Sequence, residues 1–205
     1  MSEFIPRFPR YDVLSKRHTP SWNEQTRRVV EKRRRDIPAR RFFDPHEWAT
    51  LEAIGARIIP QPDRSDSPVP IAPFIDAKLF EDRTDGTRYA GMPPLQEAWR
   101  QGLQGIDEES RRRFGDSFCD LPPERQDDIL RAVQQGEVES DGWRQLPAAQ
   151  FFKSRLLHDI VSVYYAHPAA WSEIGFGGPA SPRGYVRLRP DRHDPWEAAE
   201  EYDER

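Results

Sequence analysis

The stretch FFDPHEWATLEAIGARIIP, residues 42–60, carries a full set of signals for one amphipathic helix. Asp44 is a favoured N-cap residue, Pro45 suits the first helical position, and Glu47 has the spacing of a capping box. Apolar side chains then recur at three- and four-residue intervals, at Trp48, Leu51, Ile54 and Ile58. Pro60 ends the helix because its ring disfavours helical backbone in the residue before it. The core of the chain is therefore expected to begin with a helix.

Four further segments of the 205-residue chain show helical rather than strand periodicity. They are a short one at Pro73–Glu81 and longer ones at 94–115, 117–137 and 147–168. The expected core positions of the last segment are Phe152, Leu156, Ile160 and either Val163 or Tyr164. No stretch alternates as a strand would, and no repeat period is visible. We expect an all-α fold, an irregular bundle of about five helices with a loop-like N-terminal arm and a Gly/Pro/aromatic C-terminal segment.

Charge divides the chain into parts of opposite sign. Residues 1–41 hold 12 Lys/Arg and 5 Asp/Glu, a net +7, whereas the other residues hold 19 and 30, a net −11. We predict a basic extended arm at 1–41, a helical domain at 42–188 and an acidic tail at 189–205. A basic arm of this kind suits nucleic acid, anionic lipid or an acidic protein surface, including the chain's own body.

Composition excludes several classes of protein. The single cysteine, Cys119, allows neither an intrachain disulfide nor a cysteine metal cluster, and it is expected to be a small buried thiol. No run approaches the roughly 18 apolar residues of a membrane span. The N-terminal sequence MSEFIPRFPR lacks an apolar stretch, and none follows the arginine runs at Arg27–Arg28 and Arg33–Arg35, so no signal peptide of the chain's own is expected.

Motifs for catalysis, cofactors and metals are missing from the sequence. No histidine pair has the spacing of a helical metal site, and no nucleophile elbow is present. The glycine-rich GFGGP at 175–179 lacks both the G-x-G-x-x-G spacing and the strand–helix context of a dinucleotide loop. We therefore assign no catalytic, cofactor-binding or metal-binding residue. Two alternatives stay open: an independent enzyme with a hidden site at His158, Asp159, His167 and Glu173, and a nucleic-acid-binding adaptor that uses Lys32–Arg35.

The segment YYAHPAAWSEIGFGGPASPRGY, residues 164–185, is predicted to be a docking element. Its aromatic side chains belong to the types that are enriched in interface cores, and its glycines allow close approach of another backbone. The alternative is that the aromatic side chains fold back as a lid on the bundle. Together with aromatic anchors in the arm, the expected partner interface comprises Phe4, Phe8, Tyr11, Trp22, Tyr164, Tyr165, His167, Pro168, Trp171, Ile174, Gly175, Phe176, Gly177, Gly178, Gly184 and Tyr185.

Several of these segments resemble the gluconate 2-dehydrogenase subunit 3 family. The likeness is carried by FDPHEWATLEAIGARIIP, by PFIDAKL at 73–79, by the run from Phe118 to Leu130, and above all by YYAHPAAWSEIGFGGPASPRGY. It covers about residues 42–188 and leaves the arm and the tail outside.

The resemblance implies a chaperone-like small subunit that is not itself an enzyme. Family members bind, stabilise and help to mature an FAD-dependent sugar or polyol dehydrogenase of the glucose–methanol–choline class, often with a c-type cytochrome as electron acceptor. FAD is then expected in the partner, with no cofactor, nucleic acid or membrane span in this chain. The chain lacks the twin-arginine leader of many members, so a cytoplasmic location, or co-export to the periplasm with a signal-bearing partner, is expected.

Overall fold

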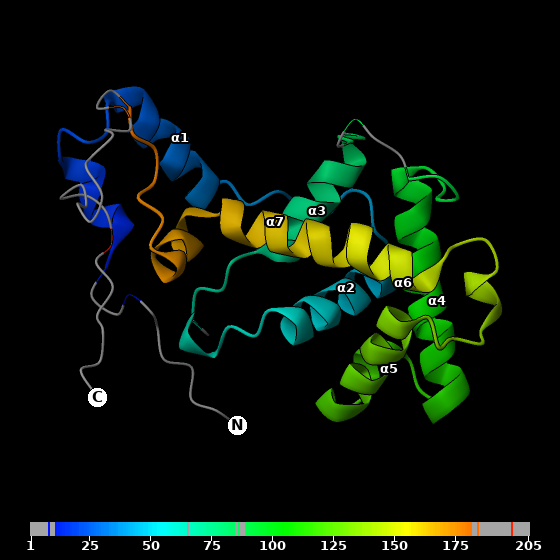
Figure 1. Ribbon diagram of the computed structural model, residues 1–205. Helices are drawn as coiled ribbons and strands as arrows, with labels where there is room; N and C mark the ends of the chain where they lie inside the picture. Colours follow the sequence, from blue (N-terminus) through cyan, green and yellow to red (C-terminus); the bar gives the residue numbers. More distant parts are fainter. Residues whose placement is uncertain are drawn as a thin grey trace, which may run out of the picture. The chain divides into compact units, whose positions relative to one another are not determined.

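The computed structural model describes residues 8, 11–64, 66–84, 86, 89–181, 184 and 198, and these residues form helices and loops without a strand. The expected all-α fold is confirmed (Figure 1). The chain divides into two compact units, which we describe separately. The helical unit is Pro38–Val163, and the terminal unit combines Met1–Ile37 with Tyr164–Arg205. None of the described helices is both long and apolar enough to cross a membrane.

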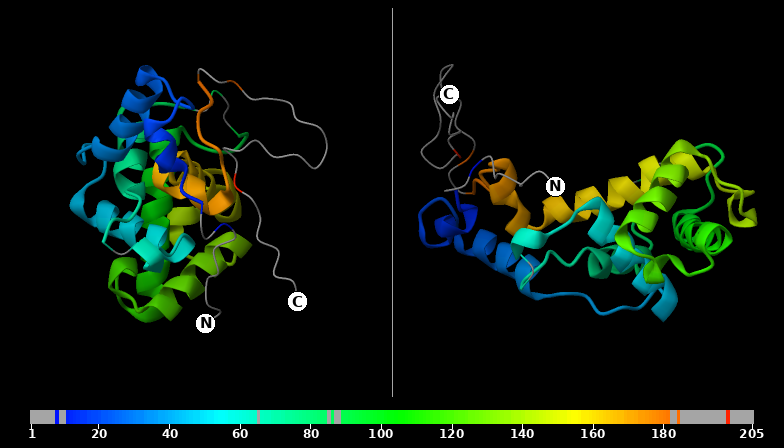
Figure 2. Two further views of the ribbon diagram at one scale, coloured as in Figure 1. Left: turned by 90° about the vertical axis from the view of Figure 1, so that its left-hand side faces the viewer. Right: turned by 90° about the horizontal axis from the view of Figure 1, so that it is seen from below.

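The helical unit holds the helices that the sequence predicts. They are α2 (Pro45–Ile58), α3 (Ile71–Phe80), α4 (Leu95–Phe114), α5 (Pro123–Gln135), α6 (Ala148–Phe151) and the first part of α7 (His158–Ala166). Short 3₁₀ turns join them at η2 (Pro62–Arg64), η3 (Phe118–Asp120) and η4 (Asp141–Trp143). Helix α2 packs against α3, α4 and α5, while α4 also packs against α6 and η4 (Figure 2). Helices α2 and α4 therefore form the centre of this unit.

The capping box at the start of α2 forms as its sequence predicts. The Asp44 side chain accepts the backbone N–H groups of His46 and Glu47 at 2.8 Å, and the Glu47 carboxylate accepts the Asp44 N–H at 2.9 Å. These bonds satisfy N–H groups that have no partner inside the helix.

The segment predicted as one helix over 147–168 contains a π-helical stretch, η5 (Phe152–Leu157), between α6 and α7. The wider i→i+5 turn of a π-helix keeps residues four apart nearly in line. The buried stripe is Phe152, Leu156, Ile160 and Tyr164, so the predicted core positions are confirmed with Tyr164 rather than Val163.

Two glycines of α4 allow large aromatic side chains to approach its backbone. A Cβ atom added at Gly102 would lie 2.1 Å from the Phe151 ring, and one added at Gly105 would lie 2.6 Å from the Trp143 ring. Phe151 also meets Trp99 edge to face, with 5.8 Å between the ring centroids. Both positions therefore require glycine, because the Cβ atom of even an alanine would collide with an aromatic ring.

Buried carboxylates in the helical unit accept hydrogen bonds from distant parts of the chain. Asp159 receives the Lys78 ammonium at 2.9 Å and the Trp99 indole N–H at 3.0 Å. Asp76, which is fully buried, receives the backbone N–H groups of residues 41, 42 and 43 at 2.7, 2.9 and 2.9 Å. Asp76 thus fixes the loop that leads into α2.

In the terminal unit, the described part of the predicted extended arm contains η1 (Val13–His18) and α1 (Glu24–Arg35). Asp12 and Asn23 act as N-caps, since their side chains accept the N–H groups of Leu14 and Thr26. From the C-terminal half come the end of α7 and η6 (Pro168–Ile174), which packs against α1 and η1. Helix α7 belongs to both units, because the boundary falls between Val163 and Tyr164.

We predict that Asp76→Asn destabilises the helical unit by about 2–3 kcal/mol, because an amide offers one acceptor oxygen where the loop presents three N–H donors. Chemical denaturation followed by circular dichroism measures the change. The matched control is Asp128→Asn, which removes an exposed carboxylate that pairs with Arg131 at 2.8 Å and is expected to cost under about 0.5 kcal/mol. Equal losses in the two variants would contradict a special role for Asp76.

Candidate functional site

The terminal unit has a small hydrophobic core of its own. Val13, Trp22, Val30 and Trp171 are buried together, and Tyr11 and Leu14 pack against them while partly exposed. Three of the four buried residues come from the N-terminal segment and one comes from η6. The predicted docking segment is therefore supported by the arm of the same chain.

Hydrogen bonds join the same two segments. The backbone N–H of Val13 donates to the Ser172 hydroxyl at 3.2 Å, and that of Asn23 donates to the Ser181 carbonyl at 2.9 Å. The Lys16 ammonium donates to the Gly177 carbonyl at 2.8 Å, although only 2% of Lys16 is exposed. The burial of Lys16 could not be predicted from the sequence, because a lysine in a basic segment is normally exposed.

Two glycines of the predicted docking segment lie close to other parts of the same chain. Gly175 and Gly178 have φ of +65° and +70°, a backbone conformation that favours glycine. A Cβ at Gly178 would lie 3.0 Å from Val13 and 3.2 Å from Trp22. One at Gly175 would lie 2.7 Å from the Phe8 ring. These glycines are predicted to allow close approach of another backbone, and the structure places side chains of the N-terminal segment against them.

The predicted interface residues differ widely in exposure. Those buried inside the terminal unit are Trp22, Tyr164, His167, Pro168, Trp171 and Gly178. Partly exposed are Phe8, Tyr11, Gly175 and Gly177. The exposed ones are Tyr165, Ile174, Phe176 and Gly184, while Phe4 and Tyr185 lie outside the described residues. Part of the aromatic set thus forms a core, and which residues a partner touches stays a prediction.

Tyr165, Ile174 and Phe176 are the exposed large apolar side chains of the C-terminal segment of the terminal unit, and we call this set the apolar surface. Their exposed fractions are 38%, 49% and 39%. Buried neighbours hold two of them in place: Phe176 meets Trp171 edge to face at 5.5 Å, and the Trp171 indole N–H donates to the Tyr165 carbonyl at 2.9 Å. Exposed large apolar side chains are typical of a protein-binding surface when they lie together.

Three of the four residues of the enzyme alternative have structural partners within their own units. Both oxygens of Asp159 are engaged by Lys78 and Trp99, and His158 on the next position is exposed. In the terminal unit, Glu173 accepts the Tyr164 hydroxyl at 2.9 Å, and His167 caps η6 by accepting the Ala169 N–H at 3.3 Å. Asp159, His167 and Glu173 therefore have structural roles within their own units, while His158 is exposed.

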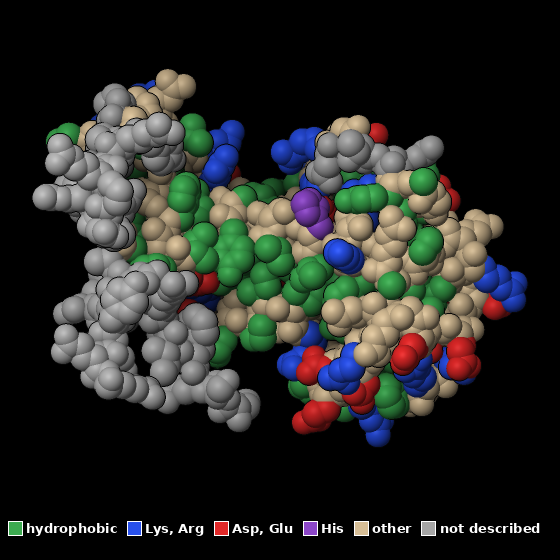
Figure 3. All heavy atoms as spheres, viewed as in Figure 1, with side chains coloured by type: hydrophobic (Ala, Val, Ile, Leu, Met, Phe, Trp, Pro, Cys, Tyr) green, Lys and Arg blue, Asp and Glu red, His purple; other side chains and the backbone are tan. Residues whose placement is uncertain are grey.

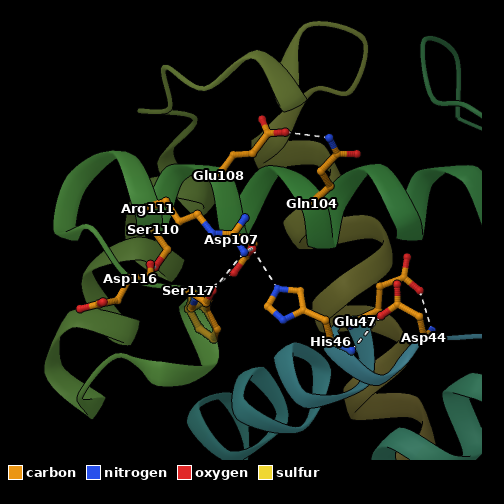
Figure 4. A network of polar contacts seen from close by, with 11 residues as sticks. Asp44, His46, Glu47, Gln104, Asp107, Glu108, Ser110, Arg111, Asp116 and Ser117 are labelled. Atoms are coloured by element: carbon orange, nitrogen blue, oxygen red, sulfur yellow. Dashed lines mark hydrogen bonds and ion pairs between the residues drawn. The ribbon is translucent and has the colours of Figure 1, made fainter.

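A polar network on α4 is the strongest other candidate for chemistry (Figure 4). The nearly buried Asp107 carboxylate lies 2.9 Å from His46 Nε2 and 2.5 Å from Arg111, and it accepts the Phe118 N–H at 2.9 Å. These contacts join α2, α4 and η3. Because its oxygens are occupied from three elements, Asp107 serves to position the backbone.

Cys119 lies beside this network and is partly buried. Burial raises the pKa of its thiol, and the charges of Asp120 and Asp107 raise it further. A thiol with a raised pKa is a poor nucleophile, because little thiolate is present at neutral pH. Within the residues that the structure describes, no group of three or more His, Cys, Asp or Glu side chains is arranged to hold a metal ion.

Comparison with known families now gives the context of these two units. A model described as gluconate 2-dehydrogenase subunit 3 matches residues 45–178, from the first residue of α2 to Gly178. The chain belongs to this family. It is accordingly a member of a subunit family of an oxidoreductase complex. Searches of curated proteins and of solved structures give no match.

The family match covers most of the helical unit but only part of the terminal unit. It spans the helical unit from α2 onward and continues through η6 into the glycine segment. The N-terminal segment that contains η1 and α1 lies before the match, although it supplies Val13, Trp22 and Val30 to the core that also contains Trp171. The matched C-terminal segment is therefore stabilised by residues outside the match.

We predict that Gly178→Ala destabilises the terminal unit by about 1–3 kcal/mol, because the new methyl group adds steric crowding against Val13 and Trp22 to the strain of positive φ. Gly184→Ala is the matched control: its φ is +76°, but nothing lies within 4 Å of the added Cβ. Tryptophan fluorescence during denaturation compares the two. Equal destabilisation would mean that only the backbone angle matters at Gly178.

The Glu109 carboxylate makes the free energy of unfolding depend on pH. Burial raises its pKa, but the N–H groups of Glu139 and Ser140 and the Arg113 guanidinium outweigh burial, so the pKa lies below its usual value. A lowered folded-state pKa stabilises the fold above the unfolded pKa, and this contribution is lost as pH falls through the folded value.

We therefore expect Glu109→Gln to reduce the unfolding free energy most above about pH 5, with the difference from the unmodified chain shrinking towards pH 3. Thermal denaturation across this range measures it. Glu52→Gln, at an exposed position of α2, is the control and should leave the profile unchanged. A difference for Glu109→Gln that stays constant with pH would refute the assignment.

Proposed function

We propose that this chain is a non-catalytic accessory subunit that binds, stabilises and helps to mature the FAD-containing large subunit of a sugar or polyol dehydrogenase of the glucose–methanol–choline class. The observation that carries the proposal is the apolar surface of Tyr165, Ile174 and Phe176, held in place by Trp171 on a subunit 3 family chain. Exposed apolar side chains cost free energy in isolation and contribute it when a partner covers them.

The buried polar and aromatic residues are consistent with a chain that serves as a scaffold. The buried acidic side chains of the helical unit position loops and helix ends, and the buried aromatic residues fill the two cores. A chain that uses these groups for its own fold suits a scaffold, with FAD and the substrate site in the partner. A c-type cytochrome would then take electrons from that partner, and the partner's signal would decide the compartment.

Stabilisation of the large subunit follows from mass action. A partner that binds only the folded flavoprotein lowers the population of its unfolded state in proportion to ligand concentration over Kd. Apolar surface that is exposed on the newly folded large subunit is also removed from competing aggregation. The accessory subunit therefore acts through binding, without a chemical step of its own.

We expect the large subunit to be soluble and loaded with FAD when it is co-expressed with this chain. When it is expressed alone, we expect less soluble protein and less bound FAD. Flavin absorbance per soluble polypeptide and dehydrogenase activity with an artificial electron acceptor are the readouts. A large subunit that matures equally well alone would overturn the accessory role.

The double variant Ile174→Ser/Phe176→Ser should weaken association with the large subunit by about tenfold or more, since central apolar contacts dominate binding energy. Its thermal stability should change less than its affinity, because neither side chain is buried, although Phe176→Ser also loses the ring contact with Trp171. Phe80→Ser is the matched control, an exposed phenylalanine at 49% in the helical unit. If this control lost as much affinity as the double variant, the assigned surface would be wrong.

A further inference from the structure

Residues 11–35, which contain η1 and α1 and which we call the strap, pack mainly against η6. The strap supplies Val13, Trp22 and Val30 to the small core of the terminal unit, and η6 supplies Trp171. Among the twelve residues of α1, Val30 is the buried one. A helix of this length is marginal by itself in water, so α1 is expected to form together with its contacts to η6.

Buried polar groups of the strap make its closed position costly. Ser21 and Trp22 are each 1% exposed, and neither the hydroxyl nor the indole N–H has a hydrogen-bond partner among the residues that the structure describes. The Lys16 ammonium donates to the Gly177 carbonyl, but only 2% of this residue is exposed. Water reaches all three groups when the strap opens, which lowers the free energy of opening.

The C-terminal segment has hydrogen bonds that do not involve the strap. The Trp171 indole N–H donates to the Tyr165 carbonyl at 2.9 Å, and the Phe176 N–H donates to the Trp171 carbonyl at 3.0 Å. The Tyr164 hydroxyl also donates to Glu173 at 2.9 Å, which joins the end of α7 to η6. This segment can therefore stay attached to α7 when the strap leaves, but Trp171 then loses the buried side chains around it.

The helical unit has a larger core than the terminal unit. Its fully buried side chains include Trp99, Phe118 and Phe151, whereas the hydrophobic core cluster of the terminal unit contains four residues. Over α5 and the end of α4, acidic and basic side chains also lie among one another on the surface (Figure 3). Regions with fewer buried apolar contacts open at lower free energy, so the terminal unit is expected to open first.

We propose that the strap opens and closes over the C-terminal segment as one cooperative unit while the helical unit stays folded, and that closure fixes Trp171 and the residues bonded to it. The segment that fills this position belongs to the chain itself: Val13 and Trp22 lie beside Gly178, and the Val13 N–H binds Ser172. This conformational equilibrium is a property of the isolated chain and does not depend on the accessory function. A partner that binds only the closed form would shift the equilibrium towards closure.

Hydrogen–deuterium exchange of the full chain, followed for single amides by NMR, tests the proposal. Val30→Ala removes two buried methyl groups, and Val29→Ala is the matched control, because it makes the same change on the same helix at a side chain that is 48% exposed. Amides of α1 and the Phe176 amide should exchange about tenfold faster in Val30→Ala than in the control. The amides of Ile54 in α2 and Ile106 in α4 should exchange equally in both variants.

Each contrary result would overturn the proposal in a different way. Equal exchange of the α1 and Phe176 amides in the two variants would mean that Val30 does not hold the strap closed. Acceleration of Ile54 and Ile106 by the same factor would mean that the chain opens as a whole. Faster exchange in α1 alone would mean that the strap and the C-terminal segment do not open together.

The unmodified chain provides a second measurement that needs no variant. As denaturant is added, the amides of α1 and of Phe176 should converge on one opening free energy, lower than that of Ile54 and Ile106. Separate values for α1 and Phe176 would overturn the cooperative unit. Protection of α1 that rises with protein concentration would show that the strap of a second copy fills this position, and would also overturn the proposal.

Discussion

Buried carboxylates that accept backbone N–H groups hold this structure together. Asp76 binds three consecutive N–H groups before α2, Asp107 binds the N–H of Phe118, and Glu109 binds those of Glu139 and Ser140. Each carboxylate lies on a helix, and each N–H group lies in an irregular connection or, for Phe118, at the first residue of η3, where no helical partner satisfies it. A bundle with many irregular connections thus gains order from a few charged acceptors, since a charge-assisted bond is stronger than a neutral one.

The same constraint shapes the terminal unit with different groups. There the Lys16 ammonium binds the Gly177 carbonyl, and the Ser172 hydroxyl accepts the Val13 N–H, so both bonds join the N-terminal segment to residues 172–178. The absence of a side chain at Gly178 lets Trp22 and Val13 approach its backbone. The aromatic side chains consequently divide into those that form the core and those that it presents to solvent. Trp171 and Phe176 illustrate the division, because the first is buried and supports the second.

The helices could be predicted from the sequence, because helix caps, prolines and apolar spacing each depend on residues that are close together in the chain. The start of α2 was predicted from Asp44, Pro45 and Glu47. The buried face of the last helix was predicted from the apolar spacing between Phe152 and Tyr164. Contacts between distant residues could not be predicted in this way. Asp159 meets Lys78 across 81 positions and Trp99 across 60, and nothing in the flanking sequence of any of the three specifies that encounter. The candidate surface was predicted in part: the segment was found, but the division between buried Trp171 and exposed Ile174 depends on an arm that sequence analysis described as extended.

The pairing of chain ends in the terminal unit has a consequence for biosynthesis. The bond from the Val13 N–H to Ser172 spans 159 positions, so the N-terminal segment has to wait for nearly the whole chain before it can close this unit. The helical unit, Pro38–Val163, is complete earlier and can begin to fold during translation. A chain that terminates prematurely would then retain much of its helical unit but would lack Trp171, Ile174 and Phe176. Such a product would lack both the side chains of the apolar surface and the Ser172 hydroxyl that Val13 binds, so only a chain translated past η6 can complete the terminal unit.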